Sequence, residues 1–245
     1  MIQTMRPIDK GSWPTKDSHA TRKRVFNDWT RAIPYLKGRT GRYCHLCELK
    51  VSNAMAIEHI KSKKHFPRLQ AHWDNFLLIC NYCNSHKLAT ITISPYKKTY
   101  YWPHLNNTIM AFDFRITGEI IPNRTYLTTK PQIDRANATI DLYGLDKVVT
   151  AQGNSDDRLK DRLEAYKQAI DRFIEFSNGK ASIHAIVDNA KNTGFFSVWL
   201  KVFNSVPNVK AALIDCLDFH LATTYCFNST YQPIPRNPTF TADPI

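Results

Sequence analysis

Four short sequences decide the fold of this chain: CHLCE at residues 44–48, IEHI at 57–60, WDNFL at 73–77 and CNYCNSHK at 80–87. The first and the last each contain two cysteines separated by two residues, and 32 residues lie between Cys47 and Cys80. Each such pair presents two thiolates to one ion, and two pairs together form the tetrahedral site that suits zinc. The spacing therefore predicts one structural Zn²⁺ held by Cys44, Cys47, Cys80 and Cys83.

Polar residues between and after the cysteine pairs have the chemistry that phosphodiester hydrolysis requires. His59 can act as a general base, because imidazole titrates near neutral pH and can take a proton from water. One carboxylate and one amide oxygen are hard ligands of the kind that suit Mg²⁺ or Mn²⁺, and this stretch contains both groups. A cation held there would stabilise the charge that develops on the phosphate and on the leaving oxygen. These residues indicate a metal-dependent nuclease core.

The order of the motifs resembles the HNH endonuclease family in its four-cysteine branch, which has the ββα-metal fold. The resemblance is carried by C-x2-C, then E-H, then N followed by two apolar residues, then C-x2-C-N-x2-K. It implies that His59 is the general base and that Glu58 and Asn84 bind the catalytic metal. It also implies that Asn75 holds the loop that bears the base and that Lys87 lies near the substrate phosphate.

Two other functions fit parts of the same pattern. Two cysteine pairs without a working polar triplet would form a zinc module that binds nucleic acid and has no activity. The same core could also cut RNA, for example tRNA, in place of DNA. Replacing His59 would separate an enzyme from a binding module, and a panel of substrates would separate the two polymers. The remaining histidines of this stretch are expected to be exposed or locally hydrogen-bonded, with His86 near enough to support the site: His45, His65, His72 and His86.

The distribution of charge indicates nucleic acid as the partner. The 245 residues carry a formal net charge of +12. Residues 1–100 contain 18 Lys and Arg against six Asp and Glu, whereas residues 101–245 contain 15 of each. The excess of positive charge therefore lies in the half with the nuclease motif, where it would attract a phosphate backbone irrespective of sequence. Lys63 and Lys64, which follow His59 in a charged stretch, are expected to bind the substrate.

We expect an α+β protein with a ββα-metal (HNH) nuclease core and a four-cysteine zinc site, followed by a mainly α-helical C-terminal half. A helix is predicted from about Ser18 to Leu36, paired strands within Leu49–Ile60, and a further helix that begins near Cys80. A hairpin turn is predicted at residues 117–119, and the aromatic run 100–102 is expected to pack in the core. Apolar residues at helical spacing predict one buried helix face formed by Leu159, Leu163, Tyr166, Ile170 and Phe173.

The chain is expected to divide into five segments. They are a basic N-terminal arm and helix (1–40), the nuclease core (41–95), an aromatic-rich β-hairpin extension (96–130), a helical domain that docks a partner (131–227) and a Pro-rich tail (228–245), which is either loose or a strap that docks a partner. The sequence shows no apolar leader and no membrane-spanning run. Cys216 and Cys226 are expected to be reduced thiols, which favours a cytoplasmic protein without a membrane partner.

A second resemblance covers more of the chain. Four stretches are similar to the HNH nuclease subunits of Septu anti-phage defence systems, the PtuB family, which also occur with some retrons: MRPIDKGSWP at 5–14, DNFLL at 74–78, YWP at 101–103 and ATIDLYGLD at 138–146. The likeness fades after about Asp146. It implies an ATPase partner of the PtuA type that controls the nuclease, and a retron complex in some cases. The chain departs from the family at Ser62, where Pro is frequent, and at Leu88, where Gly is frequent.

Overall fold

The structure is a computed structural model that describes residues 5–16, 19–51, 53–89, 99–149, 153–239 and 243–245. Within these residues the strands form three two-stranded antiparallel sheets: β1 (Thr15–Lys16) with β2 (His19–Lys23), β3 (Ala56–His59) with β4 (Phe76–Ile79), and β5 (Phe112–Phe114) with β6 (Ile120–Pro122). The α-helices are α1 (Ile33–Thr40), α2 (Asn81–Ala89), α4 (Thr108–Ala111), α5 (Lys130–Tyr143), α6 (Arg158–Ser177), α7 (Ile183–Thr193), α8 (Phe196–Val202), α9 (Pro207–Ile214) and α10 (Thr223–Cys226). The 3₁₀ turns are η1 (Trp29–Ala32), η2 (Pro67–Leu69), η3 (Trp73–Asn75) and η4 (Leu217–Phe219).

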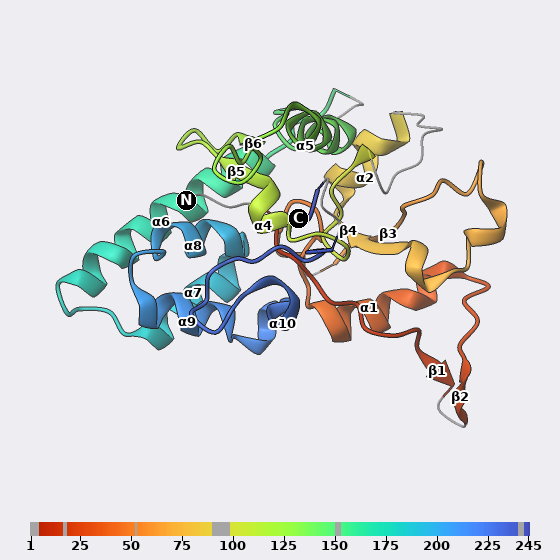
Figure 1. The fold of residues 1–245 in the computed structure, drawn as a ribbon, viewed down its shortest axis with the longest axis horizontal. Helices are drawn as coiled ribbons and strands as arrows, with labels where there is room; N and C mark the ends of the chain where they lie inside the picture. The colour runs from red at the N-terminus through yellow and green to blue at the C-terminus, as the bar shows by residue number, and fades with distance from the viewer. Residues whose placement is uncertain (1–4, 17–18, 52, 90–98, 150–152, 240–242) are drawn as a thin grey trace.

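The elements separate into two ends with a shared middle. Helices α6 to α9 gather at one end, while α1 and the β1–β2 and β3–β4 hairpins lie at the other, with α5 and α2 near the middle (Figure 1). This arrangement confirms the predicted α+β class with a helical C-terminal half. Within the part of the chain that the structure describes, no helix combines the length and the apolar composition that crossing a bilayer demands.

The β3–β4 hairpin and α2 form a ββα unit that sets the direction of the site residues. β3 pairs with β4 so that Glu58 lies opposite Leu77 and His59 lies opposite Phe76. All four β4 side chains are buried, with Leu77 and Ile79 in the core around the cysteines and Phe76 and Leu78 in a second core that includes Trp73. Because side chains alternate along a strand, Glu58 and His59 point to opposite faces of the hairpin. Only one of the paired strands expected within Leu49–Ile60 lies there, since β4 supplies the partner.

The helix predicted from Ser18 to Leu36 is wrong. The described part of that segment holds strand β2, the turn η1 and only the beginning of α1. Pro34 explains where the helix starts, because proline is favoured in the first helical turn and disrupts a helix interior. Phe26, just after β2, is fully buried against Trp73 and anchors the hairpin to the body.

Beyond the ββα unit the predicted hairpin and the buried aromatic run are confirmed. β5 and β6 flank residues 117–119, and Tyr100, Tyr101 and Trp102 are buried. The predicted inner face of α6 is wrong in part. Its fully buried residues are Arg158, Arg162, Ala165 and Ala169. Tyr166 and Phe173 pack partly against the helical core, whereas Leu159, Leu163 and Ile170 are half-buried.

The described residues of the C-terminal segment are not loose, so the first of the two alternatives for 228–245 is wrong. Asp243 is buried, forms an ion pair with Arg135 on α5 (2.8 Å) and accepts a hydrogen bond from the Tyr101 hydroxyl (2.6 Å). Ile245 is buried in the core that surrounds the cysteines. A proline-rich composition predicted disorder, but two buried polar contacts and one apolar anchor hold this strap against the body.

Candidate active site and zinc centre

The four predicted cysteines converge in one buried cluster. Their sulfur atoms all lie within 4.8 Å of one another, with 3.7 Å between the Sγ atoms of Cys44 and Cys83 and 3.6 Å between those of Cys47 and Cys80. A tetrahedron with Zn–S bonds of about 2.3 Å has edges of about 3.8 Å. These two pairs of sulfur atoms therefore already have the spacing that one zinc ion requires. Among the described residues, no other group of His, Cys, Asp or Glu gathers in this way.

The first cysteine knuckle is joined to the helical half of the protein. Its turn is closed by a hydrogen bond from the Cys44 amide to the Leu49 carbonyl (2.9 Å), and Glu48 adopts a positive φ of 65° there. The buried Glu48 carboxylate accepts hydrogen bonds from the Ser197 amide (3.1 Å) and the Ser197 hydroxyl at the start of α8. Helix α8 is thus docked directly on the zinc knuckle.

The second knuckle is approached by a buried arginine from α6. Arg158 is 1% exposed, and its Nη1 donates to Cys83 Sγ at 3.1 Å. It also pairs with Asp156 at 2.5 Å and donates to the Tyr143 and Gly144 carbonyls. A zinc ion with four thiolates carries a net negative charge, so a guanidinium beside one sulfur stabilises the cluster in an interior where unpaired charge is costly. Arg158 also connects the cluster to the end of α5.

His59 is held by three contacts. Its ring lies edge-to-face between Trp29 (5.4 Å between centroids) and Phe76 (5.3 Å), and Nε2 lies 2.9 Å from the Gln70 carbonyl oxygen. A carbonyl only accepts hydrogen bonds, so Nε2 carries the proton and Nδ1 keeps its lone pair. Burial lowers the pKa of His59; the Gln70 carbonyl opposes this change, and Lys63 lowers the pKa further. The imidazole is therefore neutral near pH 7, the form that can accept a proton.

Asn75 cross-links the two ends of the loop that follows His59. Its Oδ1 accepts from the Lys61 amide (2.7 Å), while Nδ2 donates to the Lys61 and Leu69 carbonyls (both 3.0 Å). The Asn75 carbonyl also accepts from the Ile60 amide (3.0 Å). This loop carries the Gln70 carbonyl that holds His59, so a buried amide at position 75 fixes the orientation of the imidazole indirectly.

The Glu58 carboxylate is buried between α2 and α5. Its Oε1 accepts hydrogen bonds from the Lys87 ammonium and from the Tyr143 hydroxyl, the latter at 3.0 Å. Lys87 also donates to the backbone carbonyl of His59, so its ammonium is held against the end of β3. Burial raises the pKa of Glu58, and the Lys87 ammonium opposes that rise.

Two side-chain oxygen atoms of the ββα unit have no hydrogen-bond partner among the described residues. Within the described residues neither the second oxygen of the Glu58 carboxylate nor the side-chain amide of Asn84 forms a hydrogen bond. Asn84 lies one turn before Lys87 on α2 and therefore on the same side of that helix. One carboxylate and one amide oxygen fit Mg²⁺ or Mn²⁺ with water completing the shell. That Glu58 and Asn84 hold this cation stays a prediction.

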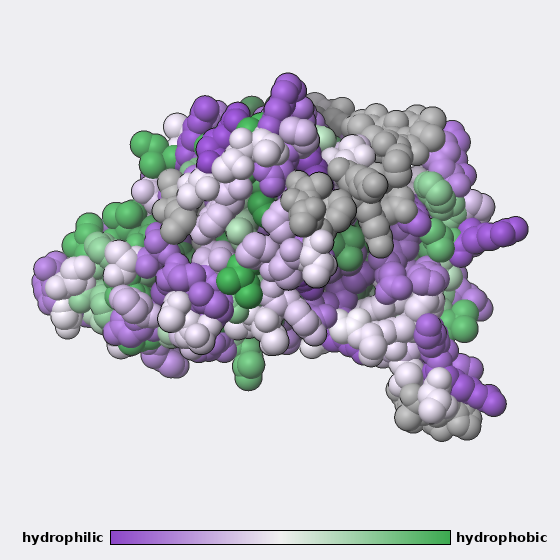
Figure 2. Space-filling view, viewed as in Figure 1, coloured by the Kyte–Doolittle hydropathy of each residue, from purple (hydrophilic) through white to green (hydrophobic). Residues whose placement is uncertain are grey.

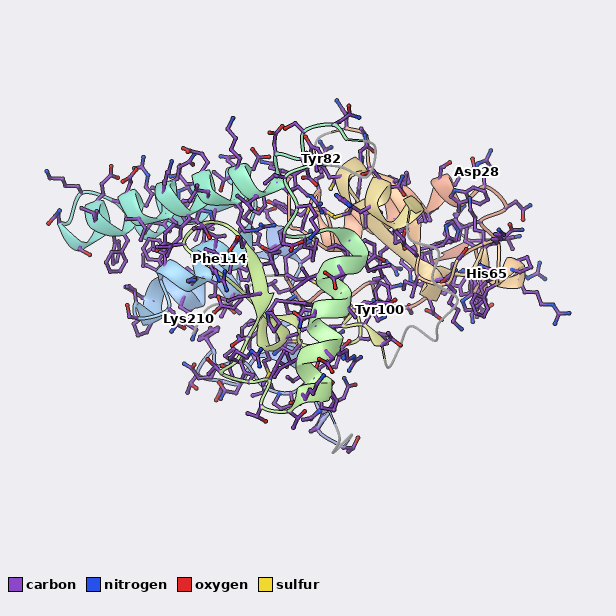
Figure 3. All side chains as sticks on the ribbon, turned by 90° about the horizontal axis from the view of Figure 1, so that it is seen from above. Asp28, His65, Tyr82, Tyr100, Phe114 and Lys210 are labelled. Atoms are coloured by element: carbon purple, nitrogen blue, oxygen red, sulfur yellow. The ribbon has the colours of Figure 1, made fainter. Side chains whose placement is uncertain are left out.

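Basic side chains project from the end of the molecule that carries His59. Lys63, Lys64 and Arg68 are exposed on the loop after β3, and Lys16, Arg22 and Lys23 are exposed on the β1–β2 hairpin. The Lys63 ammonium lies 3.8 Å from the Trp29 ring centre, so this loop meets the segment after β2 beside His59. Figure 2 shows hydrophilic projections at this end, and Figure 3 places Asp28 and His65 there among nitrogen-bearing side chains, with Lys210 toward the opposite end.

The other histidines have local roles, as expected. His45 is buried, accepts from the Leu78 amide at Nδ1 (3.0 Å) and contacts the Thr40 hydroxyl at Nε2 (2.7 Å). His72 lies 3.7 Å from the Asp74 carboxylate, and His65 is half-buried. His86 lies 3.2 Å from Asp156, which binds the arginine beside the zinc cluster.

One cavity of about 440 Å³ lies next to this site without containing it. Its lining includes Lys10, Ile60, Lys61 and Asn75, but neither Glu58 nor His59. Lys10 donates to the Trp73 and Phe76 carbonyls (3.2 and 2.8 Å), and burial lowers its pKa to about 7. The cavity therefore adjoins the loop that supports the base, whereas His59 itself lies beside the basic surface.

Several residues that hold the site were not predicted from the sequence. Trp29 and Gln70 hold His59, Tyr143 contacts Glu58, and Arg158 contacts a zinc-site sulfur. Tyr143 lies within residues 138–146, one of the four stretches that carry the second family resemblance, so that motif could have pointed to it. The Gln70 contact uses a backbone carbonyl, which any residue could supply, and thus leaves no mark in the sequence.

Comparison with known families supports a nuclease. Residues 42–90 match the model of the HNH endonuclease family, and this range spans the cysteine cluster, β3, β4 and α2. A comparison with curated proteins found no match. An HNH endonuclease domain indicates an enzyme that hydrolyses phosphodiester bonds in nucleic acid with the help of a divalent metal. The match leaves the helical C-terminal half outside the family model.

Proposed function

We propose that this protein is a DNA-cutting HNH endonuclease in which His59 is the general base and Glu58 and Asn84 hold the catalytic Mg²⁺ or Mn²⁺. The observation that carries the proposal is the Nε2 contact of His59 with the Gln70 carbonyl, which leaves Nδ1 as a proton acceptor on the strand that also bears Glu58. The four cysteines hold a structural zinc ion apart from this chemistry.

In this proposal each residue has one task. Nδ1 of His59 takes a proton from the attacking water, and the Gln70 carbonyl keeps the ring in the required tautomer. The metal supplies charge stabilisation to the phosphate when it is bound. Lys87, whose ammonium pairs with the Glu58 carboxylate, adds positive charge for the substrate phosphate. Asn75 keeps the supporting loop in place.

The assignment of a nucleic-acid substrate rests on charge. The basic loop and hairpin lie beside His59, where a polyanion would be attracted irrespective of its sequence. We favour DNA, and a panel of plasmid DNA, single-stranded DNA and total RNA would test this choice with zinc-loaded protein and added Mg²⁺ or Mn²⁺. Selective loss of tRNA with intact plasmid would identify an RNA-cutting enzyme instead. Binding without cleavage of any polymer would identify an inactive zinc module.

The biological role that we propose is that of an effector nuclease in an anti-phage defence complex. Its support is the similarity of four sequence stretches to Septu nuclease subunits, which implies control by an ATPase of the PtuA type or association with a retron. A reducing cytoplasm fits the free thiols of Cys216 and Cys226. Co-purification with the product of the neighbouring gene, followed by the same substrate panel, would test this role.

Neutralising the basic loop should weaken nucleic-acid binding. Replacing Lys63 and Lys64 together with alanine should lower the affinity and reduce the slope of log K against log salt by up to about 2, because up to two phosphate contacts are lost. The measurement is fluorescence anisotropy with a labelled duplex across a salt series. The matched control replaces Lys160 and Lys167 with alanine. Both are exposed on α6, outside the basic loop. Equal losses in both double variants would show that net charge, and not this loop, determines binding.

A further inference from the structure

The catalytic carboxylate receives a hydrogen bond from outside the family-matched domain. Tyr143 is the last residue of α5, is fully buried, and donates its hydroxyl proton to Glu58 Oε1 at 3.0 Å. It lies well beyond residues 42–90, which match the HNH model. The matched domain therefore does not contain every group that holds its own metal-binding carboxylate.

The position of Tyr143 is determined by contacts on both sides. Its ring packs edge-on against Trp102, and its carbonyl accepts from Arg158 Nη1 (3.1 Å), the same nitrogen that contacts Cys83. Gly144 follows with a φ of 52°, and a Cβ atom there would lie 2.5 Å from the His86 ring on α2. The end of α5 is thus pressed against α2 and tied to the zinc cluster, so the hydroxyl has little freedom to move.

The two groups that donate hydrogen bonds to Glu58 differ in charge, so they affect the binding of a metal ion differently. Lys87 and Tyr143 both donate a hydrogen bond to Oε1 of Glu58, whereas Oε2 accepts no hydrogen bond from the described residues. The Lys87 ammonium repels a second cation, but a neutral hydroxyl orients the carboxylate without cancelling its charge. Groups that orient a ligand in this way affect metal affinity by about 10–100-fold when removed.

We infer that Tyr143 is a positioning residue of the active site, which holds Glu58 in the orientation that binds the catalytic metal. The inference rests on the proposed function, because it assumes that Glu58 is a metal ligand. It makes α5 part of the catalytic centre in addition to any role in docking a partner.

A second buried tyrosine provides a matched control. Tyr101 donates its hydroxyl to the buried Asp243 carboxylate at 2.6 Å, and that carboxylate is also paired with a cation, Arg135. Tyr101→Phe therefore removes the same kind of contact away from Glu58. Both Phe variants should lower the melting temperature, because each leaves a buried carboxylate with one donor fewer.

The test is Mn²⁺ binding to zinc-loaded, full-length protein without nucleic acid, measured by electron paramagnetic resonance of the free ion. We expect Tyr143→Phe to bind Mn²⁺ about tenfold more weakly than wild type, with unchanged zinc content. Tyr101→Phe should bind as wild type does, and Glu58→Gln should lose binding.

Each outcome separates this inference from the proposed function. Wild-type affinity in Tyr143→Phe, together with loss in Glu58→Gln, would overturn the role of Tyr143 and leave the nuclease proposal intact. Equal weakening in the two Phe variants would also overturn it, because general destabilisation would then be the cause. Wild-type affinity in Glu58→Gln would remove Glu58 as a ligand, and both proposals would fail at that point.

Discussion

Replacing His59 with alanine should lower the rate of nucleic-acid cleavage by about 10²–10⁴-fold, the usual effect of losing a positioned general base. The zinc content should not change, because His59 lies outside the cysteine cluster. The measurement is single-turnover cleavage of a labelled substrate at saturating Mg²⁺ or Mn²⁺. Since the ring packs between Trp29 and Phe76, His59→Gln should be tested as well, because it keeps more of the buried volume.

A second histidine on the same loop serves as the control. His72→Ala also removes an imidazole from this region, but its ring contacts Trp13 and lies near Asp74, with no contact to Glu58. It should cleave as wild type does. Cleavage by both His59 variants at the wild-type rate would remove His59 from the role of base.

Replacing Cys80 with serine should prevent formation of a stable native protein. Cys80 is buried, and its sulfur lies 3.6 Å from that of Cys47 on the other knuckle. Structural zinc contributes on the order of 10 kcal/mol to the folding of small domains, a value that exceeds the total stability of many proteins. We expect insoluble protein, or protein without a cooperative unfolding transition in circular dichroism.

Cys226 provides the matched control for that variant. It is also a fully buried free cysteine, but it belongs to the helical core and not to the four-cysteine cluster. Cys226→Ser should remain soluble and should contain one zinc ion by elemental analysis. A Cys80→Ser protein that unfolds cooperatively and resembles Cys226→Ser would contradict a structural role for zinc, as would a folded wild-type protein without the metal.

The spacing of the motifs predicted the nuclease core, because the two cysteines of each pair lie close together in the sequence. Two residues between paired cysteines, and one helix after Cys80, leave few ways to place the sulfur atoms around one ion. The cysteine cluster and the ββα unit were therefore accessible from the sequence. Pro34 also marks the start of α1 in the sequence, but the prediction of a helix from Ser18 to Leu36 did not use it.

Contacts between segments that lie far apart in the sequence could not be predicted from local spacing. The inner face of α6 carries Arg158 and Arg162 where helical periodicity predicts apolar residues. Charged side chains are buried only when paired, and the partners of Arg158 are a cysteine sulfur, Asp156 and two carbonyls of the Tyr143–Gly144 turn. Since those partners come together only in the folded state, the helical spacing of the apolar residues predicted the wrong buried face for α6.

The account depends most on the claim that cleavage requires a divalent metal held by Glu58 and Asn84. The direct measurement is the cleavage rate of zinc-loaded wild-type protein in buffer freed of other divalent ions, before and after addition of Mg²⁺ or Mn²⁺, with the zinc content verified. We predict no cleavage before addition and a rate that rises with metal concentration to saturation. An equal rate before and after addition, or no cleavage of any nucleic acid at any metal concentration, would contradict the account.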